Sequence, residues 1–277
     1  MNFILEVRIL RSCCMYSISK NFKLLKRYLT LYTKNKLEFK FESFSTVFGV
    51  LITIFNNFIF WIALKNVGVK FQNWDYNKIL LMIGFNFLFI SINSIFFGFR
   101  DLEYKIISGE FDLFMVRGQN PLKLVLLERM NFLYIFLNLI FFIVCLFISQ
   151  NGFKFEIINV LLAVIVSIFA SLNFSLLYGM FSLLAFYFGK IFYVRELFFS
   201  IKDSKNYPMD IFPKVIYNLF VYTIPITLIS TVPTKIAFGE NCAGKYILIS
   251  IVGFILLCTI FKLLSKKALK HYVSTGN

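Results

Sequence analysis

Charge and reactive side chains are scarce in this chain of 277 residues. Charged residues make up 16% of it, hydrophobic residues 59%, and there is a single histidine, His271. Six long segments contain no Asp, Glu, Lys, Arg or His at all. A membrane enzyme needs paired acids, a serine with a basic partner, or metal ligands near a cavity, and a proton-coupled carrier keeps carboxylates inside its spans. The sequence argues against both classes and predicts a neutral, aromatic and hydroxyl-lined membrane interior.

The five cysteines do not form a metal or disulfide pattern. They are Cys13, Cys14, Cys145, Cys242 and Cys258. No C-x-x-C pair has a histidine partner, so neither zinc nor haem is indicated.

The N-terminal residues do not form a signal peptide, because Glu6, Arg8 and Arg11 interrupt any apolar core there. We expect residues 1–19 to be an N-terminal extension, with Met15 as an alternative start. Residues 20–277 are expected to form one membrane domain.

The six uncharged segments are suited to cross a membrane, which takes about 20 consecutive apolar residues in a helix. Four meet that requirement and two are nearly as good; they are Phe44–Leu64, Ile79–Phe99, Met130–Phe153, Ile157–Gly189, Val215–Thr234 and Tyr246–Phe261. The sequence therefore predicts an all-α polytopic membrane protein with six transmembrane helices.

The net charge of +15 follows the expected membrane topology. With a cytoplasmic N-terminus, 23 of the 29 Lys and Arg residues fall in the inside segments 1–43, 100–129, 189–214 and 262–277. Positive residues stay on the cytoplasmic side during insertion. We expect a multi-pass protein of the cytoplasmic membrane with both termini in the cytoplasm. No nucleic-acid-binding module is visible, so nucleic acid is not expected as a partner.

Residues 190–214 are the hardest to place, because a Lys or Arg at the centre of a membrane helix costs about 2.5–3.5 kcal/mol. The cations in question are Lys190, Arg195, Lys202 and Lys205. We expect residues 190–205 to lie at the cytoplasmic surface and Val215–Thr234 to cross once as the fifth span. Tyr207 would then be inside and Cys242 outside.

Residues 20–36 show the spacing of an amphipathic helix. One face would carry Phe22, Leu25, Leu29 and Tyr32, and the other Lys20, Lys23, Arg27 and Lys34. Such a helix lies in the membrane interface, with its lysines toward anionic lipid headgroups. A solvated helix packed on the protein is the alternative.

Polar and small residues mark two of the expected spans. Asn86, Asn93 and Ser94 in the second span are candidates for a substrate path, and packing hydrogen bonds are the alternative. In the fourth span small residues recur every fourth position, which lets another helix approach closely. The members of this seam are Ala163, Ser167, Ser171, Ser175 and Gly179. A sliding or subunit interface and static packing within the bundle are both open.

The stretch "GENCAGKY" (239–246) fits a phosphate-binding loop except at its last position, where Tyr246 replaces Ser or Thr. Such a loop must follow a strand, whereas this one joins two expected spans on the outside. The chain is therefore expected to bind no ATP and no other cofactor itself.

The charged chemistry gathers after the second span, where the segment from Arg100 to Arg129 carries five acids and five bases between apolar residues. Gly109, Gly118 and Pro121 punctuate it, which is typical of a short helix flanked by turns. It is expected to be a docking surface for a partner, with a plain solvated loop as the alternative.

Four stretches together resemble the ABC-2 type permeases, from about residue 16 to the end. They are "IISGEFDLFMVRGQNPL" (106–122), "YPMDIFP" (207–213), "TIPITLISTVP" (223–233) and "LKHYVSTGN" (269–277). One departure is Gly118, where the family commonly has proline. The family fold has a re-entrant outside hairpin before its last span, which would make residues near 188–206 the fifth span.

The resemblance implies six helices, a dimer of permease subunits that is homomeric or heteromeric, and a pair of separate ATPase subunits. It also makes residues 101–121 a cytoplasmic coupling element that docks on the ATPase. The residues carried over to that role are Gly109, Glu110, Asp112, Leu113, Arg117, Asn120 and Pro121.

The function expected from these observations is that of a permease subunit, not an enzyme, in an ATP-driven exporter. Its substrate would be amphipathic, lipid-like, or peptide- or drug-like. A membrane scaffold or assembly factor without transport is the alternative.

Overall fold

The structure, a computed structural model, describes residues 26–32, 34, 38, 40–66, 74–150, 156–240 and 242–274. All regular structure within these ranges is helical. The chain divides into two units, residues 1–46 and 47–277. Residues 26–32 of the first unit are helical, whereas the expected extension 1–19 and most of the expected amphipathic segment 20–36 lie outside the described residues. The interfacial helix therefore stays a prediction.

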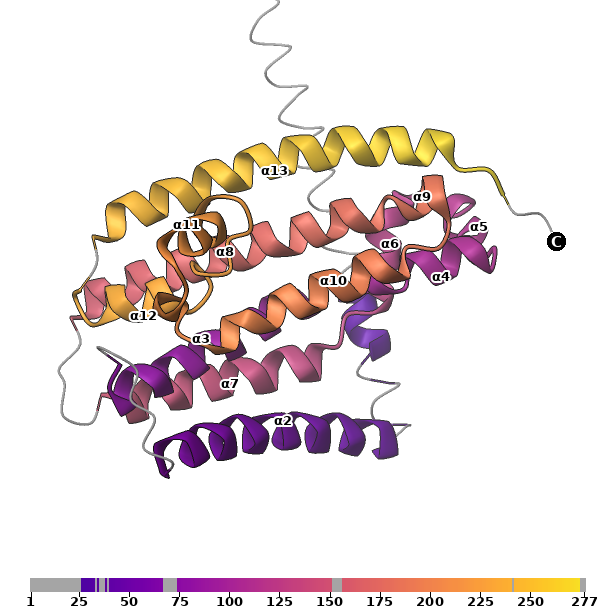
Figure 1. Cartoon of the computed structure of the whole chain (residues 1–277). Helices are drawn as coiled ribbons and strands as arrows, with labels where there is room; N and C mark the ends of the chain where they lie inside the picture. The colour runs from indigo at the N-terminus through magenta and orange to yellow at the C-terminus, as the bar shows by residue number, and fades with distance from the viewer. Residues whose placement is uncertain are drawn as a thin grey trace, which may run out of the picture. The chain divides into compact units, whose positions relative to one another are not determined.

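Five helices in the described part of the chain are long and apolar enough to span a membrane. They are α2 (Lys40–Asn66), α3 (Tyr76–Ser94), α7 (Phe132–Ser149), α8 (Ile157–Ser182) with its continuation α9 (Ala185–Phe188), and α13 (Ala243–His271). Helices α3, α7, α8 and α13 lie roughly alongside one another (Figure 1). They coincide with the uncharged runs because the backbone satisfies its own hydrogen bonds in a helix, as lipid requires.

Two groups of short helices separate these long ones. The first, between α3 and α7, comprises η1 (Phe97–Arg100), α4 (Leu102–Ile107), α5 (Asp112–Met115) and α6 (Pro121–Glu128). The second, between α9 and α13, comprises α10 (Phe192–Asp203), η2 (Ser204–Asn206), η3 (Met209–Ile211), α11 (Lys214–Tyr222) and α12 (Thr231–Ala237). The first group contains the expected docking segment, and the second contains most of residues 190–214, whose position was the hardest to predict from sequence.

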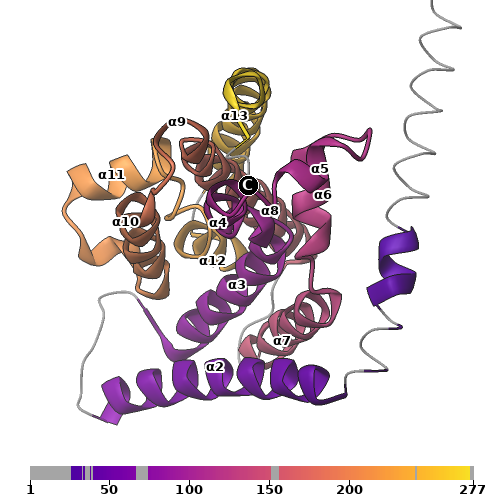
Figure 2. The ribbon, with the colours of Figure 1, turned by 90° about the vertical axis from the view of Figure 1, so that its right-hand side faces the viewer.

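Helix α3 is the most buried of the five long helices and packs chiefly against α7 and α8. Phe85, Phe87 and Phe89 are each at most 1% exposed. Gly84 lets α7 approach, since a Cβ there would lie 2.9 Å from Cys145 Cβ. Figure 2 shows α3 between α7 on one side and α8 and α12 on the other. Helix α13, by contrast, keeps most of its apolar surface exposed, as expected for a lipid-facing helix.

The expected span Val215–Thr234 is wrong, because it is not one helix. Helix α11 ends at Tyr222, and α12 begins only at Thr231. Pro225 causes the break, since it has no N–H to donate and disfavours helical geometry in the residue before it. The chain turns back here through bonds such as Thr227 N to Phe220 O (3.2 Å). Helix α12 then packs on α8 and α3.

Contrary to expectation, residues 190–205 do not all lie at the end of the bundle that holds residues 101–121, and Tyr207 lies toward the opposite end. Ile191 N, just before α10, donates to Glu103, whereas Asp210, beyond its end, accepts from Trp74 Nε1 (2.9 Å). Trp74 precedes α3 and Glu103 follows it, so these contacts mark opposite ends of a helix about 28 Å long. Helix α10 therefore runs between the two ends, alongside α8 (Figure 1).

The charge argument treated each cation as isolated in lipid, whereas the structure gives three of the four cations other surroundings. Arg195 Nη1 lies 3.3 Å from a carboxylate oxygen of Glu103, and Lys202 and Lys205 line a cavity. Cations that are paired or that face a wet cavity are tolerated within membrane proteins. The uncharged side of α10 packs inward instead, with the Phe198 ring 5.2 Å from that of Phe174 and 4.9 Å from that of Phe181.

Candidate functional site

The segment 101–121, here called the loop element, comprises α4, α5 and the first residue of α6, joined by two turns that each contain a glycine. Gly109, between α4 and α5, has φ of 76°, and Gly118, between α5 and α6, has φ of 62°. Residues with a side chain avoid this left-handed region, which explains glycine at both turns. Proline cannot adopt such a φ, so the departure at Gly118 fits the observed backbone. Asn120 caps α6 by accepting from Leu122 N (3.1 Å), and Pro121 occupies its first turn.

The tip of the loop element, here called the apex, is exposed and mixes apolar with charged side chains. Its residues are Glu110, Leu113, Met115, Val116 and Arg117. Leu113 is 59% exposed and Val116 is 81% exposed. Of the residues expected to couple to a partner, Glu110, Leu113 and Arg117 therefore lie on the free surface. Gly109, Asn120 and Pro121 instead shape the backbone beneath it.

The base of the loop element is buried and ionic. Lys105 is only 4% exposed, and its Nζ lies 2.8 Å from Glu128 Oε2 and 3.5 Å from Glu110 Oε2. The same ammonium stands 4.9 Å from the centre of the Phe114 ring. A buried cation is stable only when it is paired in this way. Lys105 thus fixes α4 to α6 and orients the apex.

Asp112 joins the loop element to the C-terminal tail. Its two carboxylate oxygens accept from Tyr272 Oη (2.9 Å) and from Ser274 Oγ (2.5 Å). Burial and the adjacent Asp112 carboxylate raise the pKa of Tyr272 to about 12, so the phenol remains a donor at neutral pH. The Tyr272 ring also packs edge-on against Phe111 at 5.0 Å. The sequence analysis quoted "LKHYVSTGN" (269–277) for its resemblance to the family but gave its residues no role. The available signal was an acid in the loop element and hydroxyl groups in the tail that could donate to it.

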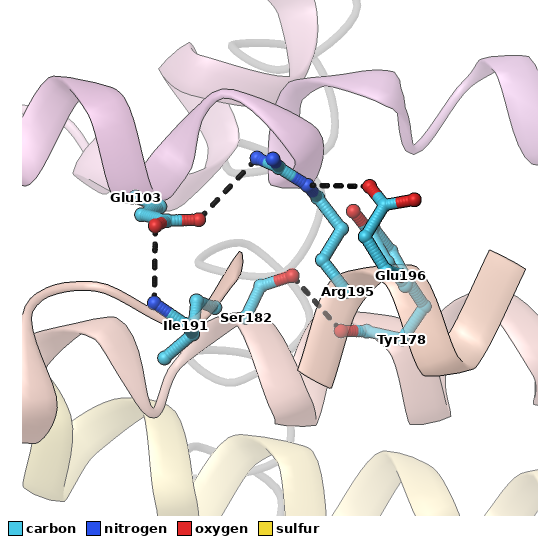
Figure 3. Close-up of polar contacts among 6 residues, drawn as sticks. All are labelled: Glu103, Tyr178, Ser182, Ile191, Arg195 and Glu196. Atoms are coloured by element: carbon cyan, nitrogen blue, oxygen red, sulfur yellow. Dashed lines mark hydrogen bonds and ion pairs between the residues drawn. The ribbon is translucent and has the colours of Figure 1, made fainter. Parts of the chain in front are cut away.

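Glu103 joins the loop element to α10, and sequence reasoning did not single out this residue (Figure 3). The residue is 9% exposed, and its Oε1 accepts from Ile191 N (3.0 Å) while its Oε2 accepts from Arg195 Nη1 (3.3 Å). Ile191 directly precedes α10, so this carboxylate satisfies a backbone donor at a helix N-terminus, where negative charge is favoured. Glu196 lies farther from the guanidinium, 3.8 Å from Arg195 Nε.

A cavity of about 270 Å³, here called the central cavity, is lined chiefly by residues of α2, α3, α7, α8 and α10. Two of the expected path residues, Asn86 and Asn93, line it, whereas Ser94 does not. Asn86 Nδ2 donates to Lys205 O (3.2 Å), and Asn93 Oδ1 accepts from Ser175 Oγ (3.2 Å). Ser94 Oγ bonds to Ser91 O within its own helix (2.6 Å).

The expectation of a neutral interior is wrong for this cavity. Arg100, Lys202 and Lys205 line it together with a single carboxylate, that of Asp203, among the described lining residues. The sequence analysis did not expect Lys202 of α10 and Lys205 of η2 to line a cavity, because it placed residues 190–205 at the membrane surface.

The seam residues of α8 are buried, but they meet several elements. Ser167 Oγ donates to Ile229 O (2.7 Å), just before α12, and Ser175 Oγ donates to Asn93 of α3. A Cβ on Gly179 would lie 2.7 Å from the Phe99 ring of η1. Ala163 and Ser171 are each 0% exposed. Within the unit 47–277 the seam thus contacts neighbours along its whole length.

The stretch Gly239–Tyr246 follows helix α12, and its last four residues, from Ala243 on, already belong to α13. It therefore lacks the preceding strand that a phosphate-binding loop requires.

Comparison with protein families matches residues 51–276 to the family described as ABC-2 family transporter protein. No curated protein and no solved structure matches the chain. The matched range includes the loop element, α10 and the tail, so the contacts described above lie within the family region. Together with its long apolar helices, this match shows that the chain belongs to the ABC-2 family transporter proteins and is a membrane permease.

Proposed function

We propose that the chain is the permease subunit of an ATP-driven exporter and that a separate ATPase subunit supplies the energy. The observation that carries this proposal is the loop element, which combines an exposed apex with a buried, ion-paired base. Leu113 and Val116 form an exposed apolar pair with the charged residues Glu110 and Arg117 beside it. An apolar surface with a charged rim is typical of a site that binds a groove on a partner protein.

The proposed topology places the loop element in the cytoplasm. The tail lies at the same end of the bundle, because Tyr272 and Ser274 bond to Asp112. Lys262, Lys266, Lys267 and Lys270 on the last part of α13 add positive charge toward that end. The protein would sit in the cytoplasmic membrane with its C-terminus inside, α10 as a short fifth crossing, and α11 and α12 as a re-entrant hairpin outside.

The contacts offer a route from the ATPase to the substrate path. Closure of the ATPase would move the apex, and Lys105 would make α4, α5 and α6 move together. Glu103 would pass that movement to α10, whose other end lines the central cavity. Asp112 would pass it to the end of α13. The free energy of ATPase binding would thereby shift the equilibrium between two conformations of the bundle, and this shift couples the ATPase to the substrate path.

The proposed partners are an ABC ATPase subunit, a second permease subunit of the same or a different sequence, and membrane lipids. A dimer would place two loop elements on two ATPase subunits.

The test is co-purification with the ATPase from membranes that contain both. Val116→Lys should abolish binding, because it puts a charge in the centre of the apex. Val273→Lys is the matched control, since Val273 is equally exposed at 81% but lies in the tail. Retained binding in Val116→Lys would remove the docking assignment. An intact complex that neither moves substrate nor responds to it would favour the scaffold instead.

A further inference from the structure

The residue types around the central cavity fall into two groups. The first group is aromatic and includes Phe87, Phe89, Phe174, Phe198 and Phe199. The second is basic and comprises Arg100, Lys202 and Lys205, each of which stands over a phenylalanine ring. A ligand that satisfies both must carry an apolar body and a negatively charged head.

The three basic side chains have few carboxylate partners within the protein. Among the described residues no ion pair involves Arg100, whose guanidinium instead stands 5.5 Å from the centre of the Phe97 ring and 5.1 Å from that of Phe199. Lys202 Nζ is 3.8 Å from Asp203 Oδ1, which is a loose pair. Lys205 is 5% exposed, and its Nζ bonds to the neutral amide of Asn206 (2.9 Å). A buried basic group keeps its positive charge best beside an anion, and the cavity provides one carboxylate for three basic side chains.

A second, independent observation points to a ligand. Asn86 is 4% exposed, and its Oδ1 has no hydrogen-bond partner among the described residues. Its Nδ2 donates to Lys205 O, which fixes the orientation of the amide, and Asn86 lines the same cavity as the basic side chains. A buried acceptor without a partner is destabilising, and a hydroxyl or acidic O–H of a bound molecule would supply the missing hydrogen bond.

We propose that the central cavity binds an amphipathic organic anion, with its acidic head on Arg100, Lys202 and Lys205 and its apolar body among the phenylalanines. The volume of about 270 Å³ lies just below the usual range for small-molecule sites, so it accommodates a phosphate or carboxylate with a short alkyl or aromatic part. This assignment rests on the proposed function, because it makes the anion the transported substrate. It extends that function from an amphipathic cargo to an anionic one.

Binding of radiolabelled hexyl phosphate to the full chain in nanodiscs of neutral lipid tests the assignment. Hexyltrimethylammonium is the probe of opposite charge with the same alkyl chain. We expect hexyl phosphate to bind at least tenfold more tightly, and Lys202→Gln to weaken it about tenfold, as expected for a lost charge-assisted contact. Lys190→Gln is the matched control, since Lys190 is exposed and lies outside the cavity lining.

A second variant is expected to strengthen binding, which poor folding could not cause. Asp203→Asn removes the carboxylate from the cavity lining and should tighten hexyl phosphate binding several-fold. Equal affinity for the two probes, or no effect of both Lys202→Gln and Asp203→Asn, would overturn the assignment. Binding needs no ATPase, so it can fail while the co-purification test succeeds, and the reverse.

Anionic lipids and soluble anions share this chemistry, and one further arm separates them. Hexyl phosphate binding is repeated in nanodiscs that contain phosphatidylglycerol. Competition by that lipid identifies a lipid headgroup as the source, and unchanged binding identifies a soluble anion.

Discussion

Replacing Glu103 by glutamine keeps the size of the side chain but removes the charge that joins α4 to α10. The amide oxygen could still accept from Ile191 N, but the amide nitrogen would then face Arg195, donor against donor. A charge-assisted hydrogen bond is worth about 1.5–3 kcal/mol. Because the Arg195 side chain is 27% exposed, water recovers part of this. We expect Glu103→Gln to lower the free energy of unfolding by about 1–2 kcal/mol.

Detergent-induced unfolding followed by far-UV circular dichroism measures this loss. Arg195→Gln and the double variant complete a cycle, in which the double variant should lose about 1 kcal/mol less than the two single losses together. Glu196→Gln is the control, because Glu196 is 52% exposed and 3.8 Å away. ATPase activity in the assembled complex should also become insensitive to substrate in Glu103→Gln. Additive losses, or equal losses in Glu103→Gln and Glu196→Gln, would refute the link between α4 and α10.

Gly179→Ala should lower the free energy of unfolding by about 1–3 kcal/mol, since its Cβ would overlap a phenylalanine ring at 2.7 Å. Gly49→Ala should not, because nothing lies within 4 Å of the added carbon. Tyr272→Phe should speed amide hydrogen exchange in the tail by about threefold to tenfold through loss of one hydrogen bond. With the pKa of this phenol at about 12, its contribution is complete below the ordinary value of 10.0 and is lost only as pH rises through about 12. The exchange difference should therefore be the same at about pH 6 and about pH 9. Tyr207→Cys, in a chain without its native cysteines, should react with a membrane-impermeant thiol reagent in intact cells, whereas Ile107→Cys should react only after the membrane is opened.

The long helices could be predicted from sequence because each contains an uncharged run of about membrane-spanning length. The runs at Ile79–Phe99, Met130–Phe153 and Ile157–Gly189 correspond to α3, α7 and α8 with α9. Lipid selects these segments by local composition alone, so no knowledge of their neighbours is needed.

Helix α10 could not be predicted in the same way, because its cations are tolerated through contacts made elsewhere in the chain. Arg195 is paired with a carboxylate 92 positions earlier, and Lys202 faces a cavity built by four other helices. The resemblance to the family implied a fifth span near residues 188–206 with a re-entrant hairpin after it, whereas the insertion cost of single charges argued against a span there.

The loop element was located from sequence, but its supporting contacts were not. Gly109 and Gly118 marked its turns correctly, since positive φ is a local property of glycine. Asp112 was expected to face a partner, yet its carboxylate accepts from hydroxyls 160 and 162 positions away. Pairings over such separations depend on the packed fold and leave no local pattern.

Cross-linking between the apex and the ATPase tests the central claim most directly. In a complex without native cysteines, Val116→Cys and a single cysteine in the ATPase groove are joined by a short bismaleimide. The account predicts a covalent permease–ATPase product with Val116→Cys and none with Val215→Cys, which is 78% exposed at the other end of the bundle. An ATPase that co-purifies but cross-links equally to both positions, or to neither, would contradict the claim that the loop element is the coupling site.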